Sequence, residues 1–263
     1  MTDSILYQEN PSGVATVTLN RPEKHNAFDD LLINELTQLF QKIAENPAIR
    51  VMILAANGKS FCAGADVNWM QRMAAYNYDE NLADANKLAL MLRTLNSMPQ
   101  ATIARIQGAA YGGAVGLIAC CDMAVATKMS QFCLSEVKLG LVPATISPYV
   151  IEAIGARSAR RYFNTAELFS ARRARRLGLI NESVTEEELD DTLNQLVKAV
   201  LANSPKAVTT SKQLIANVAN HSINQELIDM TSRTIAAIRV SEEGQEGLSA
   251  FLQKRRPNWR GEQ

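Results

Sequence analysis

The chain is poor in the residues that bind metals or form disulfides. Among its 263 residues are four cysteines and two histidines. No two cysteines form a CxxC pair, and none has a histidine partner at ligand spacing: Cys62, Cys120, Cys121 and Cys133. This scarcity argues against a metal site and against a disulfide framework. Reduced thiols in a cytoplasmic protein are the expected state.

Net charge and long apolar runs are also missing. Lys and Arg together number 27, as do Asp and Glu, so the formal charge is zero and a general nucleic-acid binder is not expected. No stretch is long and apolar enough to span a membrane. The first residues, MTDSILYQEN, lack a basic and apolar leader, so we expect no signal peptide. The arginines gathered between 157 and 176 are read as solvated helix faces.

What the chain does contain is a core-sized share of apolar residues, 47%, arranged in alternating patterns. Strand-like runs alternate with segments of helical spacing as far as about residue 185, and only helices follow. This alternation predicts an α/β core. The expected strands are 5–8, 14–20, 51–56, 101–106, 122–126 and 131–134; the expected helices begin at Asp29, span Leu82–Leu95 and 113–121, and include one that begins at Ser204-Pro205.

A glycine-rich stretch from Gln107 to Pro143 carries the strongest chemical signal. A strand runs into Gly108 and then Gly112-Gly113, where a helix is expected to begin. The free N–H groups at a helix start hold anions, or a carbonyl oxygen that is becoming an anion. Further along, Glu136 places a carboxylate within an apolar segment, LSEVKLGLVP.

A second loop, SFCAGAD at 60–66, follows a strand that is expected to be buried. Taken alone, its AGAD sequence is most simply a tight turn. Together with Gly112-Gly113, it offers a second backbone N–H donor. Two donors from separate loops would grip one oxygen.

These segments resemble the enoyl-CoA hydratase/isomerase (crotonase) family. The likeness rests on GAAYGGAVGLIACCD followed by SEVKLGLVP, and on three further motifs that keep their order: NRPEKHNAF at 20–28, SFCAGADVNWM at 60–70 and EGLSAFLQKRRPNW at 246–259. The resemblance implies a spiral of ββα units over residues 1–195. It also implies a helical region over residues 196–263 that in relatives builds trimers, often paired into hexamers.

The resemblance also implies a site. The N–H groups of Ala65 and Gly113 would form an oxyanion hole for a thioester carbonyl, and Glu136 would transfer protons. Coenzyme A enters as part of the acyl-CoA substrate, with no separate cofactor and no metal. The motifs assign its contacts to Ala63, Asp66, Val67 and Asn68 near adenine, Lys24 near phosphate, and Phe251 and Lys254, often from a neighbouring subunit. A solvated turn lysine is an equally good interpretation of Lys24.

The sequence departs from the family pattern at the site. Hydratases of the family carry a first glutamate where this chain has Gly116, about twenty residues before Glu136, and Ala114 replaces a glycine. The segment LVPATISPYV brings hydroxyls at Thr145, Ser147 and Tyr149.

Three functions fit these departures to different degrees. One carboxylate fits a Δ3,Δ2-enoyl-CoA isomerase. The combined motifs, however, look most like bacterial 3-methylglutaconyl-CoA and isohexenylglutaconyl-CoA hydratases of leucine and acyclic-terpene breakdown, which we rank first. In that case Gly116 is expected to leave room for the substrate's branch, and Ser147 or Tyr149 to meet its carboxylate. A non-catalytic CoA- or RNA-binding module is the third hypothesis, and a retained Glu136 argues against it.

Overall fold

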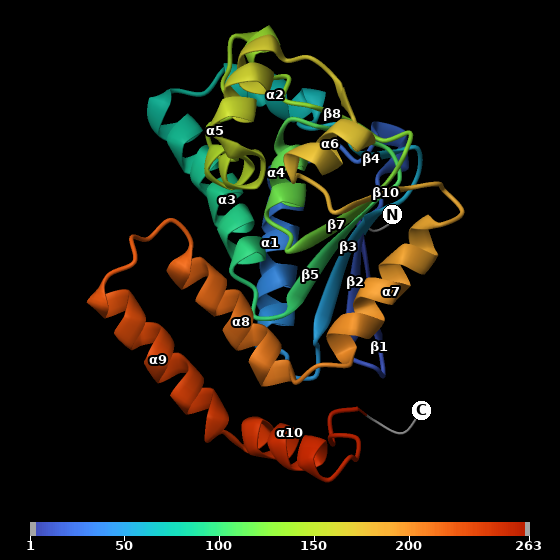
Figure 1. Cartoon of the computed structure of the whole chain (residues 1–263). Helices are drawn as coiled ribbons and strands as arrows, with labels where there is room; N and C mark the ends of the chain where they lie inside the picture. Colours follow the sequence, from blue (N-terminus) through green and yellow to red (C-terminus); the bar gives the residue numbers. More distant parts are fainter. Residues whose placement is uncertain (1–3, 261–263) are drawn as a thin grey trace.

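A six-stranded sheet runs through the centre of the protein, whose computed structural model describes residues 4–260 (Figure 1). Its order is β1-β2-β3-β5-β7-β10, with β1 antiparallel to β2 and all other neighbours parallel. The strands are β1 (Ile5–Asn10), β2 (Val14–Leu19), β3 (Val51–Ala56), β5 (Ala101–Ile106), β7 (Met123–Thr127) and β10 (Glu182–Val184). Every residue of β3 is buried, which confirms the strand expected from its unbroken apolar run.

A second, smaller sheet lies beside the first and carries the functional loops. It has the order β4-β6-β8-β9, formed by β4 (Ser60–Cys62), β6 (Ala109–Tyr111), β8 (Gln131–Cys133) and β9 (Phe169–Ser170). A large-sheet strand, a small-sheet strand and one or more helices follow each other three times along the chain: β3-β4-α2, β5-β6-α4 and β7-β8-α5. This succession confirms the expected ββα units. The strand expected at 131–134 is present as β8, whereas the sequence pattern predicted loops at β4 and β6, because nearby glycines at 64, 108 and 112 mark turns.

Helices cover the sheets and close the main core. They are α1 (Asp30–Glu45), α2 (Val67–Ala74), α3 (Tyr78–Asn96), α4 (Gly113–Ala119) and α5 (Ser147–Thr165), with 3₁₀ turns η1 (Pro22–Lys24) and η2 (Glu136–Leu139). As predicted, α1 begins after Asp29, whose carboxylate accepts the Leu32 N–H at 2.9 Å. Within α1, Leu32, Leu36, Phe40 and Ile43 are all buried.

Within the described residues, every element from α6 (Ala171–Leu177) onward is a helix except β10. Helix α7 (Leu189–Leu201) packs Leu193 and Val197 on the large sheet. Beyond it an arm of α8 (Pro205–Val218), α9 (Gln225–Arg239) and α10 (Glu242–Leu252) extends from the body of the molecule (Figure 1). The division at 195/196 stays a prediction, and α7 runs across it. Within residues 4–260, no helix has the length and apolarity that crossing a bilayer requires.

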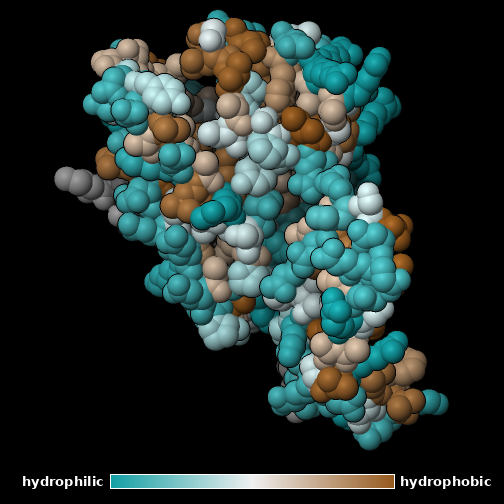
Figure 2. All heavy atoms as spheres, turned by 90° about the vertical axis from the view of Figure 1, so that its left-hand side faces the viewer, coloured by the Kyte–Doolittle hydropathy of each residue, from teal (hydrophilic) through white to brown (hydrophobic). Residues whose placement is uncertain are grey.

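The arm exposes many apolar side chains. In the described chain, α8 and α9 bury no residue and α10 buries only Ala250. Figure 2 shows apolar atoms on the lower lobe of the molecule, at the height of α10 in Figure 1. The exposed residues include Ile215, Ile223, Ile228, Ile235, Val240, Leu248, Phe251 and Leu252.

Candidate active site

The first candidate oxyanion donor, Ala65, is fixed by a parallel backbone bridge to Phe28. The Phe28 N–H donates to the Gly64 carbonyl and the Asp66 N–H donates to the Phe28 carbonyl, both at 2.9 Å. In such a bridge the paired residue's own N–H points away from its partner strand. The Ala65 N–H is therefore directed away from Phe28, and Ala65 is only partly buried.

The second candidate donor, Gly113, stands at the first position of α4. An N–H at this position has no carbonyl to bond within its own helix. Gly112 makes the turn before it, with φ 55° and ψ −125°, a conformation that favours glycine. The Gly112 N–H donates to the Cys133 carbonyl at 2.8 Å, which anchors the turn on β8. The two loops lie side by side, because a Cβ on Gly64 would be 3.2 Å from the Tyr111 carbonyl oxygen.

Glu136 opens η2 and places its carboxylate beside this turn. Its Oε1 is 3.3 Å from the position that a Cβ on Gly112 would occupy. Its Oε2 is buried and accepts no hydrogen bond from any residue within 4–260. Burial raises the pKa of Glu136 above its usual value, an effect that its own backbone N–H partly offsets. A buried carboxylate with one unpartnered oxygen, beside the turn that ends at the Gly113 N–H, is suited to move a proton next to a polarised carbonyl.

The loop that follows Ala65 is tied down by charged pairs. Arg21 contacts Asp29 at 2.8 Å and Asp66 at 3.1 Å, and Lys24 contacts Asp66 at 3.1 Å. Burial disfavours the charged Asp66, but the hydrogen bonds from Lys24 and the Asn68 N–H, with the charges of Lys24 and Arg21, lower its pKa overall. Asp66 thereby caps α2. The Lys24 side chain thus forms an ion pair with Asp66 and is also exposed to solvent.

The remaining residues expected near coenzyme A divide into two groups. Ala63, Val67 and Asn68 lie beside Ala65, with Val67 and Asn68 exposed at the start of α2. Phe251 and Lys254 belong to α10 and the turn after it, and Figure 1 shows α10 and α2 at opposite ends of the molecule. One chain therefore brings Lys24, Asp66 and Ala65 together, whereas Phe251 and Lys254 stay a prediction that concerns a neighbouring copy.

The expectation about Gly116 is wrong. A Cβ at this position would lie 2.3 Å from Cγ2 of Ile146 and 2.7 Å from its Cβ, and Leu92 lies 3.6 Å away. Ile146 therefore fills the space beside Gly116, and no room is left there for a substrate branch. The missing first glutamate has been replaced by an apolar contact between α4 and the residue that precedes α5.

Three residues that shape the site were not singled out from the sequence. Phe28 joins the two loops, and Arg21 clamps the residues on both sides of Phe28 by donating to the Ala27 carbonyl at 3.1 Å and to Asp29. Asn26 is fully buried and its amide donates to the Asn57 and Ser60 carbonyls at 2.8 and 2.9 Å. All three belong to the segment NRPEKHNAF at 20–28. This polar motif just before a helix is the sequence signal that could have revealed them.

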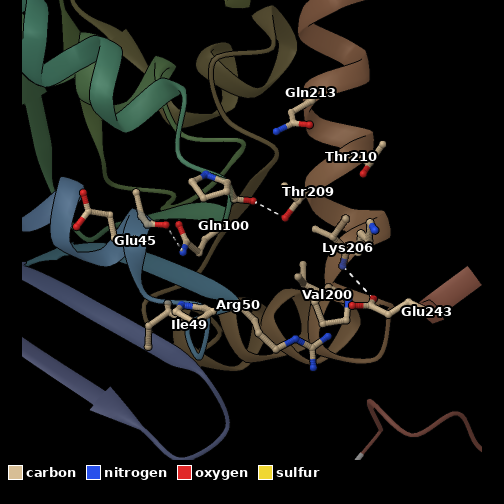
Figure 3. Close-up of a pocket in the computed structure, with 15 residues that line it drawn as sticks. Glu45, Ile49, Arg50, Gln100, Val200, Lys206, Thr209, Thr210, Gln213 and Glu243 are labelled. Carbon is tan, nitrogen blue, oxygen red and sulfur yellow. Dashed lines mark hydrogen bonds between the residues drawn. The ribbon is translucent and has the colours of Figure 1, made fainter. Parts of the chain in front are cut away.

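A separate hollow of about 490 Å³ lies between the body and α8 (Figure 3). It is lined by Arg50 and Gln100, which precede β3 and β5, whereas Ala65 and Gly113 follow the β3-β4 and β5-β6 units. There Thr209 donates to the Pro99 carbonyl at 2.9 Å, and the Lys206 N–H donates to Glu243 at 3.0 Å. The hollow thus lies at the opposite ends of these strands from the candidate active site.

Two loop N–H groups and a buried carboxylate on a ββα fold are suited to stabilising negative charge on a carbonyl oxygen beside a proton transfer. The sequence model of the family described as Enoyl-CoA hydratase/isomerase matches residues 9–262, so the chain belongs to that family.

Solved structures agree with this family. An enoyl-CoA hydratase from Shewanella pealeana is 47% identical, with TM-score 0.95, covering 98% of this chain and 96% of that one. A structure assigned as an enoyl-CoA hydratase/isomerase (crotonase) from Legionella pneumophila is 45% identical, with TM-score 0.93 and coverage of 99% and 100%. Among relatives compared by sequence alone, the crotonyl-CoA hydratase of Syntrophomonas wolfei is 29% identical, covering 97% of each chain.

Proposed function

We propose that this enzyme hydrates a branched acyl-CoA that carries a second carboxylate, of the 3-methylglutaconyl-CoA type. Water adds across C2=C3, and the negative charge that develops on the thioester oxygen is held by the N–H groups of Ala65 and Gly113. The observation that carries the proposal is the unpartnered Oε2 of Glu136 beside the Gly112-Gly113 turn. Each N–H donor in such a hole is worth about 3–4 kcal/mol in the transition state.

A single carboxylate serves both proton transfers in this proposal. Glu136 takes a proton from a water that lies between it and C3, and returns that proton to C2 of the enolate. The raised pKa of Glu136 brings the carboxyl closer to the pH at which it can both accept and donate. The distal carboxylate of the substrate helps to hold the water, the part that a second glutamate would otherwise play.

Tyr149 is the better of the two hydroxyl partners for that distal carboxylate. Ser147 has one hydroxyl proton, and it is donated to the Ala144 carbonyl at 2.8 Å. Tyr149 is half-buried, and its pKa is raised chiefly by burial, so its hydroxyl remains a donor at neutral pH. The charge of Arg93 acts on Tyr149 in the opposite direction, so a cation lies within electrostatic reach.

Isomerisation of a 3-enoyl-CoA is the second candidate. It is favoured by the contact of Ile146 with Gly116, because Ile146 occupies the space beside the position of the first family glutamate. Of the two glutamates in the family motif, this chain retains Glu136. An isomerase needs only to carry one proton between C2 and C4, and a single base is enough.

Product analysis by mass separates the two functions. The enzyme is incubated with 3-methylglutaconyl-CoA, crotonyl-CoA and a 3-enoyl-CoA. We expect a mass gain of one water with the first, and much slower hydration of crotonyl-CoA. Equally fast hydration of crotonyl-CoA would show that the distal carboxylate has no role. Conversion of the 3-enoyl-CoA alone, to a 2-enoyl product of unchanged mass, would establish the isomerase.

We further propose a trimer or hexamer that works in the cytoplasm, where four free cysteines persist. The arm exposes Ile215, Ile235 and Phe251, more apolar surface than a lone chain normally leaves in water. A neighbouring copy that covers the arm would bring Phe251 and Lys254 to a second active site. Light scattering at micromolar concentration tests this assembly, and a monomer would contradict it.

A further inference from the structure

We propose that Phe28 is a positioning residue that aligns the two halves of the oxyanion hole. The proposal rests on the proposed function, because it assumes that Ala65 and Gly113 act on one carbonyl oxygen. Phe28 is the residue whose backbone holds the first donor and whose ring supports the second.

The backbone of Phe28 sets the place of Ala65. Its N–H and carbonyl bond the residues on either side, Gly64 and Asp66, at 2.9 Å each. Any shift of the Phe28 backbone would therefore carry Ala65 with it. A displacement of about 1 Å at a catalytic group is enough to cost a large factor in rate.

The ring of Phe28 sets the place of Gly113. A Cβ on Gly113 would lie 2.4 Å from Cζ of the ring and 3.3 and 3.4 Å from the two Cε atoms. The backbone of α4 at its first residue thus rests directly on the tip of the aromatic ring. No side chain fits between them, which explains why glycine is required at this position.

The ring itself cannot easily move. Phe28 is 2% exposed, and its ring packs against Trp69 with centroids 6.2 Å apart. Its neighbours in sequence are clamped, because Arg21 bonds both the Ala27 carbonyl and the Asp29 carboxylate. A rigid spacer between two loops fixes the separation of their N–H groups before substrate arrives, and donors fixed in advance stabilise charge without reorganisation.

The experiment shortens the Phe28 side chain and measures whether the oxyanion hole binds a thioester carbonyl less tightly. Phe28→Leu and Phe28→Met are compared with Phe40→Leu, a control in which an equally buried phenylalanine of α1 is shortened. Calorimetry measures binding of butyryl-CoA and of S-butyl-CoA, a thioether that lacks the carbonyl oxygen. Neither ligand has a double bond to hydrate, so the comparison reports the hole alone.

We expect wild type and Phe40→Leu to prefer the thioester to the same degree, and both Phe28 variants to lose about tenfold or more of that preference. Turnover of the best substrate should fall about 10–100-fold in the Phe28 variants, because misaligned N–H groups hold the charge on the thioester oxygen less well. Thermal unfolding checks that each variant is folded. If Phe28→Leu is unstable, Phe28→Met still tests the proposal, because methionine fills more of the space of the ring.

Two results separate this proposal from the function on which it rests. A wild-type enzyme with no preference for butyryl-CoA over S-butyl-CoA would refute the oxyanion hole itself. A wild-type preference that survives in both Phe28 variants, or that Phe40→Leu loses equally, would leave the hole in place and overturn the role of Phe28.

Discussion

The carboxylate of Glu136 lies directly against the backbone of Gly112, with Oε1 3.3 Å from where a Cβ on that glycine would stand. The next residue is Gly113, which starts α4. The proton-transfer group and one oxyanion donor are therefore coupled through a single turn, and a change at Gly112 acts on both.

Replacing the carboxylate tests the chemistry most directly. Glu136→Gln keeps the size of the side chain but removes its ability to accept a proton. Turnover should fall about 10²–10⁴-fold, the usual contribution of a general acid–base. Glu152→Gln, an exposed carboxylate on α5, is the matched control and should retain activity. Equal activity of the two variants would remove Glu136 from the mechanism.

A methyl group on Gly112 should damage activity as well as stability. Gly112→Ala forces alanine into φ 55° and ψ −125° at a cost of about 1–3 kcal/mol, and pushes its Cβ toward Glu136. Gly155→Ala is the control, since Gly155 has φ 74° and ψ 150° but nothing within 4 Å of an added Cβ. Urea unfolding should show both losses of stability, whereas kcat should fall only for Gly112→Ala.

The pKa of Glu136 predicts how stability depends on pH. Burial raises this pKa in the folded protein above its unfolded value, so the folded state favours the protonated acid. That contribution is fully present below the unfolded pKa and is lost as pH rises through the folded pKa. Glu136→Gln, which stays neutral, should therefore gain stability over wild type as pH rises from about 4.5 toward 8. A difference in unfolding free energy that is constant over this range would contradict the burial of the charge.

The contact of Gly116 with Ile146 predicts a compensating pair of substitutions. Gly116→Ala should destabilise by about 1–3 kcal/mol because its Cβ overlaps Ile146, outweighing the roughly 1 kcal/mol that alanine gains in a helix. Ile146→Ala alone should cost about 2–5 kcal/mol through the cavity it leaves. The double variant should cost at least about 1 kcal/mol less than the two together. Strictly additive costs in denaturant unfolding would show that the two positions do not touch.

The main elements of the fold could be predicted because their signals are local. The apolar run at Val51–Ala56 and the capping sequences at Asp29 and Ser204-Pro205 each lie within a few residues of the structure they specify. The short strands β4 and β6 could not, because three residues are held in place by pairing with distant strands rather than by their own pattern.

The site was only partly predictable for the same reason. Glycines and a carboxylate in an apolar segment pointed to Gly113 and Glu136. The residues that pack against these glycines could not be predicted. Phe28 contacts Gly113 and Ile146 contacts Gly116, and these pairs are 85 and 30 residues apart in the sequence. Periodicity reports the spacing of side chains on one element, and it carries no information on which other element fills a gap.

The arm formed by α8, α9 and α10 also has a consequence for local unfolding. Within residues 4–260, α8 is bonded to the body by Lys212, which contacts Asp122 at 2.8 Å and the Gln100 carbonyl at 3.1 Å, and by Thr209, which donates to the Pro99 carbonyl. After α10, Arg50 donates to the Trp259 carbonyl and Arg260 to the Ala202 carbonyl. A segment with so few buried residues opens at a free energy well below that of the whole domain. Amide hydrogens of α9 should exchange with solvent long before those of β3. If other copies cover the arm, that exchange should slow as the protein concentration rises, while the exchange of β3 stays unchanged.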